Sequence, residues 1–99
     1  MKLNDLECLT GTEFHDRHDR HHVCKDDAPI YFLIDRDNWL TICQSDEDGD
    51  DLWRGEWETY GGEFFTAYDG YETPDECLAA LQLMAQGLVA GAILEAVNG

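Results

Sequence analysis

Acidic side chains are concentrated in one short segment of the chain. Five of the six residues from 46 to 51 carry a carboxylate: Asp46, Glu47, Asp48, Asp50 and Asp51. Such a cluster can bind calcium, face a basic partner, or hydrate a loop. A calcium loop of the EF-hand type needs glycine at position 6 and glutamate at position 12. Counting from Asp46, these positions hold Asp51 and Trp57, so we expect either a solvated loop or a partner-facing surface.

The spacing of these carboxylates favours a partner-facing surface. An extended chain advances ~3.3 to 3.6 Å per residue, close to the ~3.4 Å between successive phosphates of one DNA strand. Residues 52–58 alternate Trp53, Gly55 and Trp57 with Arg54, Glu56 and Glu58, which places the glutamates on the strand face opposite the tryptophans. The predicted partner-binding residues are therefore Asp46, Glu47, Asp48, Asp50, Asp51, Glu56, Glu58 and Glu63.

The charge of the chain is large and uneven. Twenty-two Asp and Glu oppose six Lys and Arg, a formal charge of −16 over 99 residues. From Asp37 onward there are 14 acids and one base, Arg54. Surfaces of this sign repel phosphate backbones and anionic membranes, so we expect no direct binding to nucleic acid or membrane. A field of one sign is suited to steering a basic partner.

A histidine-rich segment is the second candidate site. All four histidines, with Cys24, fall between residues 15 and 24. On a helix, His15, His18 and His22 share one face and could bind zinc together with Cys24. The aspartates and arginines between them equally suit a polar surface helix.

The sequence gives no indication of catalysis. Ser45 is the only serine and lacks a G-x-S-x-G context, and no phosphate-binding glycine motif is present. We therefore expect a protein that is not an enzyme and that needs no cofactor.

The chain divides into three predicted segments within a single domain, 1–99. Residues 1–28 form an N-terminal helical segment: the spacing of Leu3, Leu6 and Leu9 predicts a short helix, and Thr12 can cap a polar helix after it. Residues 29–68 form an antiparallel sheet. Its predicted strands are 30–34, 39–43, 52–58 and 63–68, separated by turn-forming residues.

Residues 73–97 form a predicted C-terminal helix. Thr73, Pro74 and Glu76 make a strong helix start with a capping box. The helix is apolar around most of its circumference and contains Gly87 and Gly91 in a G-x-x-x-G pattern, so a homodimer contact through it is possible. The expected fold class is α+β, a four-stranded antiparallel meander with a long C-terminal helix packed on it and a short N-terminal helical segment.

The first residues contain no apolar stretch of the kind that a secretory signal has, and no run of 18 apolar residues occurs, so we expect neither a secretory leader nor a membrane span. We therefore expect it in the cytoplasm, where its four cysteines would remain thiols, mostly buried.

In size, one-sided acidity and expected architecture, the chain resembles the small acidic phage-encoded inhibitors that imitate DNA, including anti-CRISPR and anti-restriction proteins. The resemblance implies binding to the basic nucleic-acid channel of a host defence complex, with target DNA blocked. Two alternatives remain open: a halophilic or acid-adapted structural protein without a partner, and a small zinc module using the segment from His15 to Cys24.

Overall fold

A computed structural model describes residues 1–18, 24–47 and 49–87. Five strands form one antiparallel sheet in which each strand pairs with the next in sequence, in the order β1-β2-β3-β4-β5. The elements, in chain order, are η1 (Leu3–Asp5), β1 (Glu7–Thr10), α1 (Gly11–His18), β2 (Pro29–Ile34), β3 (Asn38–Gln44), β4 (Trp53–Thr59), β5 (Phe64–Tyr71) and α2 (Pro74–Ala85). The α+β class expected from the sequence is confirmed.

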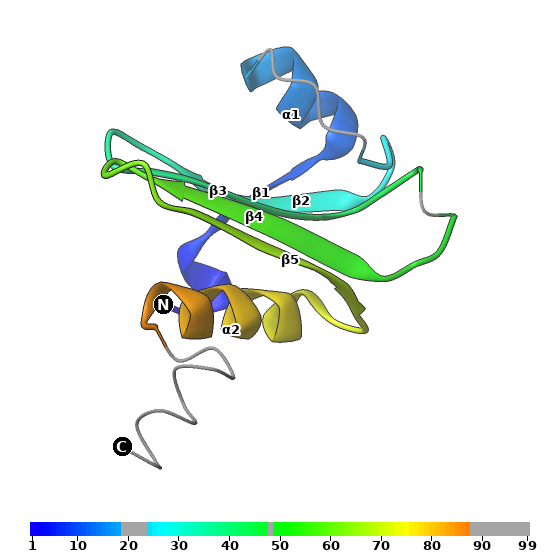
Figure 1. Cartoon of the computed structure of the whole chain (residues 1–99). Helices are drawn as coiled ribbons and strands as arrows, with labels where there is room; N and C mark the ends of the chain where they lie inside the picture. Colours follow the sequence, from blue (N-terminus) through cyan, green and yellow to red (C-terminus); the bar gives the residue numbers. More distant parts are fainter. Residues whose placement is uncertain (19–23, 48, 88–99) are drawn as a thin grey trace.

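The two helices lie on opposite faces of the sheet, α1 on one side and α2 on the other (Figure 1). The core on the α2 side contains Leu40 and Ile42 of β3 and Leu81 of α2. The core on the α1 side is smaller, with Phe14 of α1 packed on Phe32 of β2. Burying one such side chain contributes about 1.5 to 3 kcal/mol, so the larger α2-side core supplies most of the hydrophobic stabilisation.

The predicted hairpin of β2 and β3 is confirmed, with Tyr31 opposite Ile42 and Ile34 opposite Trp39. The alternation in β4 is confirmed as well. Trp53 is buried in the α2-side core and Trp57 packs against the same core. The glutamates between and after them therefore face the α1 side.

The prediction of four strands was wrong, because β1 adds a fifth. The helix expected over Leu3, Leu6 and Leu9 is limited to one 3-10 turn, after which the chain pairs with the outer edge of β2. Leu6 is buried in the α2-side core, and Leu9 packs against the α1-side core. Burial in two separate cores, with strand pairing between them, outweighs the helical spacing.

The cap of helix α1 is Thr10, two residues before the predicted cap at Thr12. Thr10 and Glu13 cap each other: the Glu13 N–H donates to Thr10 Oγ1 (3.2 Å), and the Thr10 hydroxyl donates to Glu13 Oε1 (2.9 Å). Gly11 lies against the chain at Lys25, where a Cβ would stand 2.2 Å from the Lys25 carbonyl oxygen. This contact requires glycine, and it places the helix over β1 and β2.

Helix α2 has the predicted start and an earlier end than predicted. The Glu76 N–H donates to Thr73 Oγ1 (3.2 Å), with Pro74 in the first turn. The helix ends at Ala85, and Gly87 adopts a φ of 73°, a left-handed conformation that terminates a helix. Gly87 therefore lies outside α2. Gly91 and the rest of the predicted helix to residue 97 lie outside the described residues, so the homodimer contact through the G-x-x-x-G pattern stays a prediction. None of the helices in the described ranges is both long enough and apolar enough to cross a bilayer.

The prediction of four thiols was also wrong, because Cys24 and Cys43 form a disulfide. Cys24 pairs with Ser45 in an isolated antiparallel bridge, which brings the segment after α1 alongside the end of β3. Cys8 and Cys77 are free cysteines. Burial raises the pKa of the Cys77 thiol to about 12.

Gly55 of β4 packs tightly against β3 and against Cys77 of α2. A Cβ there would lie 2.8 Å from the Thr41 carbonyl oxygen and 3.1 Å from Cys77 Sγ. We expect Gly55→Ala to lower the free energy of unfolding by about 1 to 3 kcal/mol, measured by urea denaturation. Gly61→Ala is the matched control, because its Cβ would meet only Thr59 Oγ1 at 3.9 Å. Equal midpoints for the two variants would contradict this packing.

The disulfide closes a loop of 19 residues in sequence separation. The Cys24→Ser/Cys43→Ser variant should lose about 3 kcal/mol of stability, because the unfolded chain is then no longer cross-linked. Thiol titration of the unfolded, non-reduced protein should find two thiols, and Cys8→Ala should remove one of them without a change in stability. A count of four thiols would refute the bond.

Candidate acidic binding surface

The acidic loop, residues 45–52, connects β3 to β4. Two hydrogen bonds shape it: the Gln44 side-chain amide donates to the Asp51 carbonyl (2.6 Å), and the Glu47 N–H donates to Ser45 Oγ (3.1 Å). Gly49 has a φ of 69°, which a residue with a side chain rarely adopts. The loop therefore has a defined conformation on both sides of residue 48, which itself lies outside the described residues.

Two of the predicted partner-binding acids are bound within the molecule. Arg54 holds both Asp50 oxygens, at 2.9 and 3.1 Å, and these bonds keep the pKa of the Asp50 carboxyl below its usual value. Lys25 Nζ donates to Asp51 Oδ1 (2.7 Å) and to the Asp50 carbonyl (3.0 Å). The Asp51 hydrogen bond raises the pKa of Lys25. Asp50 and Asp51 thus fix the loop, while Asp46 and Glu47 are exposed and outside the described ion pairs.

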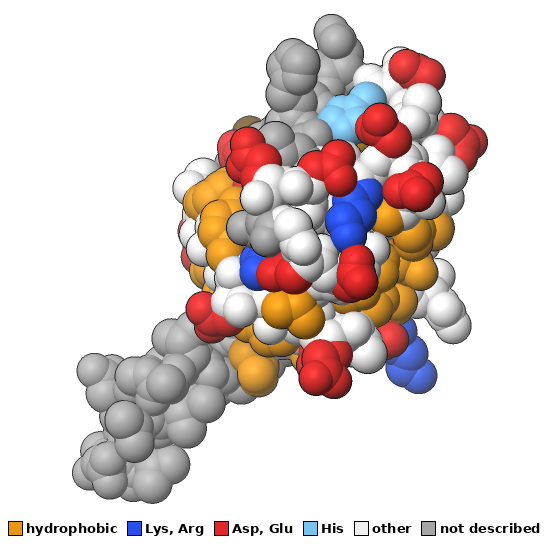
Figure 2. Space-filling model, turned by 90° about the vertical axis from the view of Figure 1, so that its right-hand side faces the viewer, with side chains coloured by type: hydrophobic (Ala, Val, Ile, Leu, Met, Phe, Trp, Pro, Cys, Tyr) orange, Lys and Arg blue, Asp and Glu red, His pale blue; other side chains and the backbone are white. Residues whose placement is uncertain are grey.

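Figure 2 views the molecule from the right-hand side of Figure 1. On this face carboxylate side chains are spread widely, with Lys and Arg side chains interspersed among them. This picture agrees with a loop in which bases are held by neighbouring acids and other acids stay at the surface.

Glu56 and Glu58 lie on the sheet face that α1 covers in part. Glu56 is opposite Thr41 and Thr66, and Glu58 is opposite Trp39 and Phe64. Paired residues share a face, so these side chains extend across β3, β4 and β5 on the α1 side. The predicted projection of both glutamates away from the tryptophans of β4 is confirmed.

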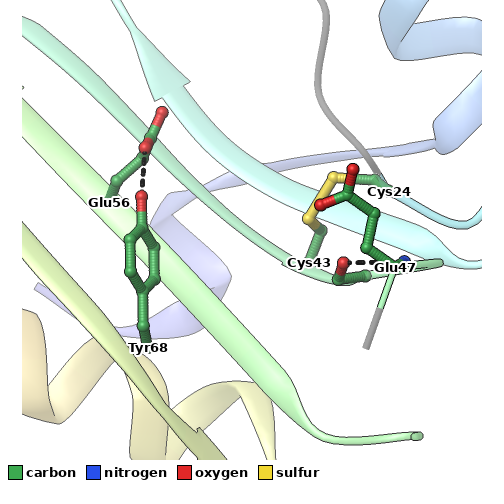
Figure 3. The surroundings of a disulfide bond; sticks show 6 residues. Cys24, Cys43, Glu47, Glu56 and Tyr68 are labelled. Carbon is green, nitrogen blue, oxygen red and sulfur yellow. Dashed lines mark hydrogen bonds between the residues drawn. A yellow bond between two sulfur atoms is a disulfide. The ribbon is translucent and has the colours of Figure 1, made fainter. Parts of the chain in front are cut away.

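Exposed aromatic rings accompany these glutamates. Phe64 and Tyr68 of β5 are 53% and 54% exposed. The Tyr68 hydroxyl donates to Glu56 Oε2 (2.6 Å), and Figure 3 shows the two side chains pointing toward each other on the side of the sheet that carries the Cys24–Cys43 disulfide. Burial, followed by this hydrogen bond, raises the pKa of Tyr68 to about 12.

The far end of the hairpin holds further acids that the sequence interpretation missed. Asp35 and Asp37 lie in the turn between β2 and β3, where the Tyr60 N–H donates to the Asp37 carbonyl (2.7 Å). With Trp39 and Glu58 they line an open hollow of about 290 Å³ between the two turns. The pattern Asp-Arg-Asp-Asn signalled a turn, but not that this turn would lie beside the one between β4 and β5.

The predicted residues are thus spread along β4 rather than gathered at one point. The acidic loop precedes β4, Glu56 lies within it, Glu58 lies near its end and the exposed Glu63 follows in the next turn. Since a strand rises about 3.3 Å per residue, the acids span on the order of 20 Å.

The described part of the histidine segment does not form a metal site. His18 packs on Phe14 and Phe32, with ring centroids 4.8 and 5.2 Å apart, and Cys24 is bound to Cys43 and is not available as a thiolate ligand. Among residues 1–18, 24–47 and 49–87, no group of three His, Cys, Asp or Glu side chains could hold a metal ion. His22, the remaining predicted ligand beside His15, lies outside these ranges.

No family model matches the sequence, and neither a curated protein nor a solved structure matches it significantly. The chemistry of the surface therefore carries the functional argument.

The pKa of Tyr68 provides a test of the hydrogen bond between its hydroxyl and Glu56. A raised phenol pKa contributes stability that is present below the ordinary value near 10 and is lost as pH rises toward about 12. Subtracting the absorbance titration curve of Tyr68→Phe from that of the unsubstituted protein should leave the ionisation of one tyrosine near pH 12. Glu56→Gln should move that step to lower pH, because the carboxylate no longer opposes the phenolate. Ionisation of this tyrosine near 10 in the unsubstituted protein would contradict the contact.

Proposed function

We propose that the protein is an acidic DNA-mimic inhibitor. It binds the basic nucleic-acid-binding channel of a host defence complex and blocks the binding of target DNA, with CRISPR effector complexes as the first class of target. One observation carries the proposal. Lys25 and Arg54, the bases beside the acidic loop, are bound by Asp51 and Asp50, so the exposed acids around them present negative charge to a partner.

The dimensions of β4 support imitation of a phosphate row. Glu56 and Glu58 are two residues apart on one face, which corresponds to about 6.6 to 7 Å along the strand. Two steps along one DNA strand cover about the same distance. The exposed Asp46 and Glu47 before the strand and Glu63 after it extend the row in both directions.

The mechanism is competitive and electrostatic. Negative charge on the inhibitor accelerates encounter with a Lys- and Arg-lined channel and is screened by salt, so affinity falls as ionic strength rises. The partner is a protein, and neither catalysis nor a cofactor is involved. The host cytoplasm is the proposed compartment. A disulfide there has to be shielded from reducing thiols, and Cys24 is only 4% exposed.

The test is displacement of labelled duplex DNA from purified CRISPR effector complexes and restriction enzymes. We expect inhibition that rises with inhibitor, falls with added DNA and weakens with salt. The variant Asp46→Asn/Glu47→Gln/Glu58→Gln/Glu63→Gln should lose about tenfold in affinity, since ~1.4 kcal/mol over four charges corresponds to that factor. None of these four acids belongs to a described ion pair.

A matched comparison uses two double variants: Asp46→Asn/Glu47→Gln in the acidic loop and Asp16→Asn/Glu72→Gln as the control. Both pairs remove two exposed charges, but only the first alters the acidic loop. Equal losses would show that net charge alone matters and would contradict a defined mimic surface. Two results together would favour the halophilic alternative. The protein would leave DNA binding by every tested complex unchanged, and it would unfold in low salt and become steeply more stable toward molar KCl.

A further inference from the structure

We propose that the aromatic-acidic face of the sheet binds an arginine-bearing segment of the partner. This face consists of Glu56, Glu58, Phe64, Thr66 and Tyr68, on the α1 side of β4 and β5. The inference rests on the proposed function for its partner and adds the side chain that is recognised. It assigns the anchoring contact to this face rather than to the acidic loop.

The first argument is exposure. On the same side of the sheet, Phe14 of α1 is fully buried against Phe32 of β2. On the β4–β5 half, Phe64 and Tyr68 instead remain more than half exposed. Two large exposed rings on one strand face, with only Thr66 between them, are unfavourable in a monomer unless a partner covers them.

The second argument is preorganisation. Phe64 lies opposite Glu58, and the Tyr68 hydroxyl is bonded to Glu56, so each ring has a carboxylate beside it. These side chains stand on paired strands rather than on a loop. Aromatic side chains lose little conformational entropy on binding, and a face fixed in advance lowers the cost further.

The third argument is charge complementarity. Arg54, a basic residue of β4 beside this face, is engaged within the molecule: its two terminal nitrogens bind Asp50 and its Nε donates to the Tyr68 carbonyl (3.1 Å). The face is therefore negative and disfavours nucleic acid and anionic lipid. A cation that also stacks on aromatic rings complements both the negative charge and the exposed rings of this face.

Arginine meets this requirement better than lysine. Its planar guanidinium stacks on an aromatic ring while its N–H groups, which lie in the guanidinium plane, donate to carboxylates beside the ring. A lysine ammonium is a strongly hydrated point charge that gains less from the rings. The expected occupant is therefore a segment with arginines placed to reach Phe64 and Tyr68.

The experiment measures the affinity of the full chain for two labelled eight-residue peptides by fluorescence polarisation. One peptide alternates arginine with glycine, and the other alternates lysine with glycine. We expect the arginine peptide to bind about fivefold to tenfold more tightly. Phe64→Ala and Tyr68→Ala leave net charge unchanged and should bring the ratio close to one. Tyr68→Phe, which keeps the ring, should retain it. Tyr60→Ala is the matched control, because Tyr60 is 83% exposed, lies in the turn after β4 and is not one of the five residues of this face.

Amide NMR shifts on titration with the arginine peptide should concentrate in β4 and β5, and thermal melting checks that each variant is folded. Equal binding of the two peptides, or a ratio that Phe64→Ala and Tyr68→Ala leave unchanged, would overturn the inference. So would a concentration-dependent dimer abolished by Phe64→Ala, since a second copy would then cover the face. If loop variants still weaken DNA displacement, the proposed function stands. Peptide selectivity without any effect on defence complexes would reject that function and retain the face.

Discussion

The length of α1 determines which surface of this protein is left open. Eight helical residues span about 12 Å, whereas five strands spaced about 4.8 Å apart form a sheet close to 20 Å wide. Gly11 and the mutual cap of Thr10 and Glu13 place this short helix over β1 and β2. The α1 side of β4 and β5 retains exposed rings and carboxylates, while α2 covers the opposite face.

Basic residues are scarce, and their positions shape the electrostatic field. With 22 acids and six bases, no arrangement of ion pairs can neutralise the chain. Lys25, the residue after Cys24, binds the acidic loop at Asp50 and Asp51. Arg54 of β4 binds the loop at Asp50. Each of these bases restrains the loop through an ion pair with one of its acids, Lys25 with Asp51 and Arg54 with Asp50. The other carboxylates of the described strands and loops are therefore held on a defined framework, which distinguishes this surface from that of a flexible acidic tail.

The sequence predicted the parts of the fold that depend on local patterns. Tryptophan alternation in β4, the hairpin of β2 and β3, and the Thr73 cap were all predicted correctly, because period and capping chemistry are local. The strand at Glu7–Thr10, the Cys24–Cys43 bond and the internal pairing of Asp50 and Asp51 depend on segments distant in sequence. The end of α2 was missed for a different reason: the apolar pattern continues past Gly87, while the backbone conformation of that glycine ends the helix.

Charge and aromatic contact serve different purposes on such a surface. Attraction between exposed charges is screened over about 8 Å at physiological salt, so it accelerates encounter but discriminates poorly among basic partners. A ring and a carboxylate fixed side by side discriminate by geometry, because only a cation of suitable shape satisfies both after desolvation. In this protein the exposed acids extend along β4, and the rings of Phe64 and Tyr68 lie beside its glutamates. A partner attracted by the long row of acids therefore meets, on the β4–β5 part of the same sheet face, the contacts that can select an arginine over a lysine.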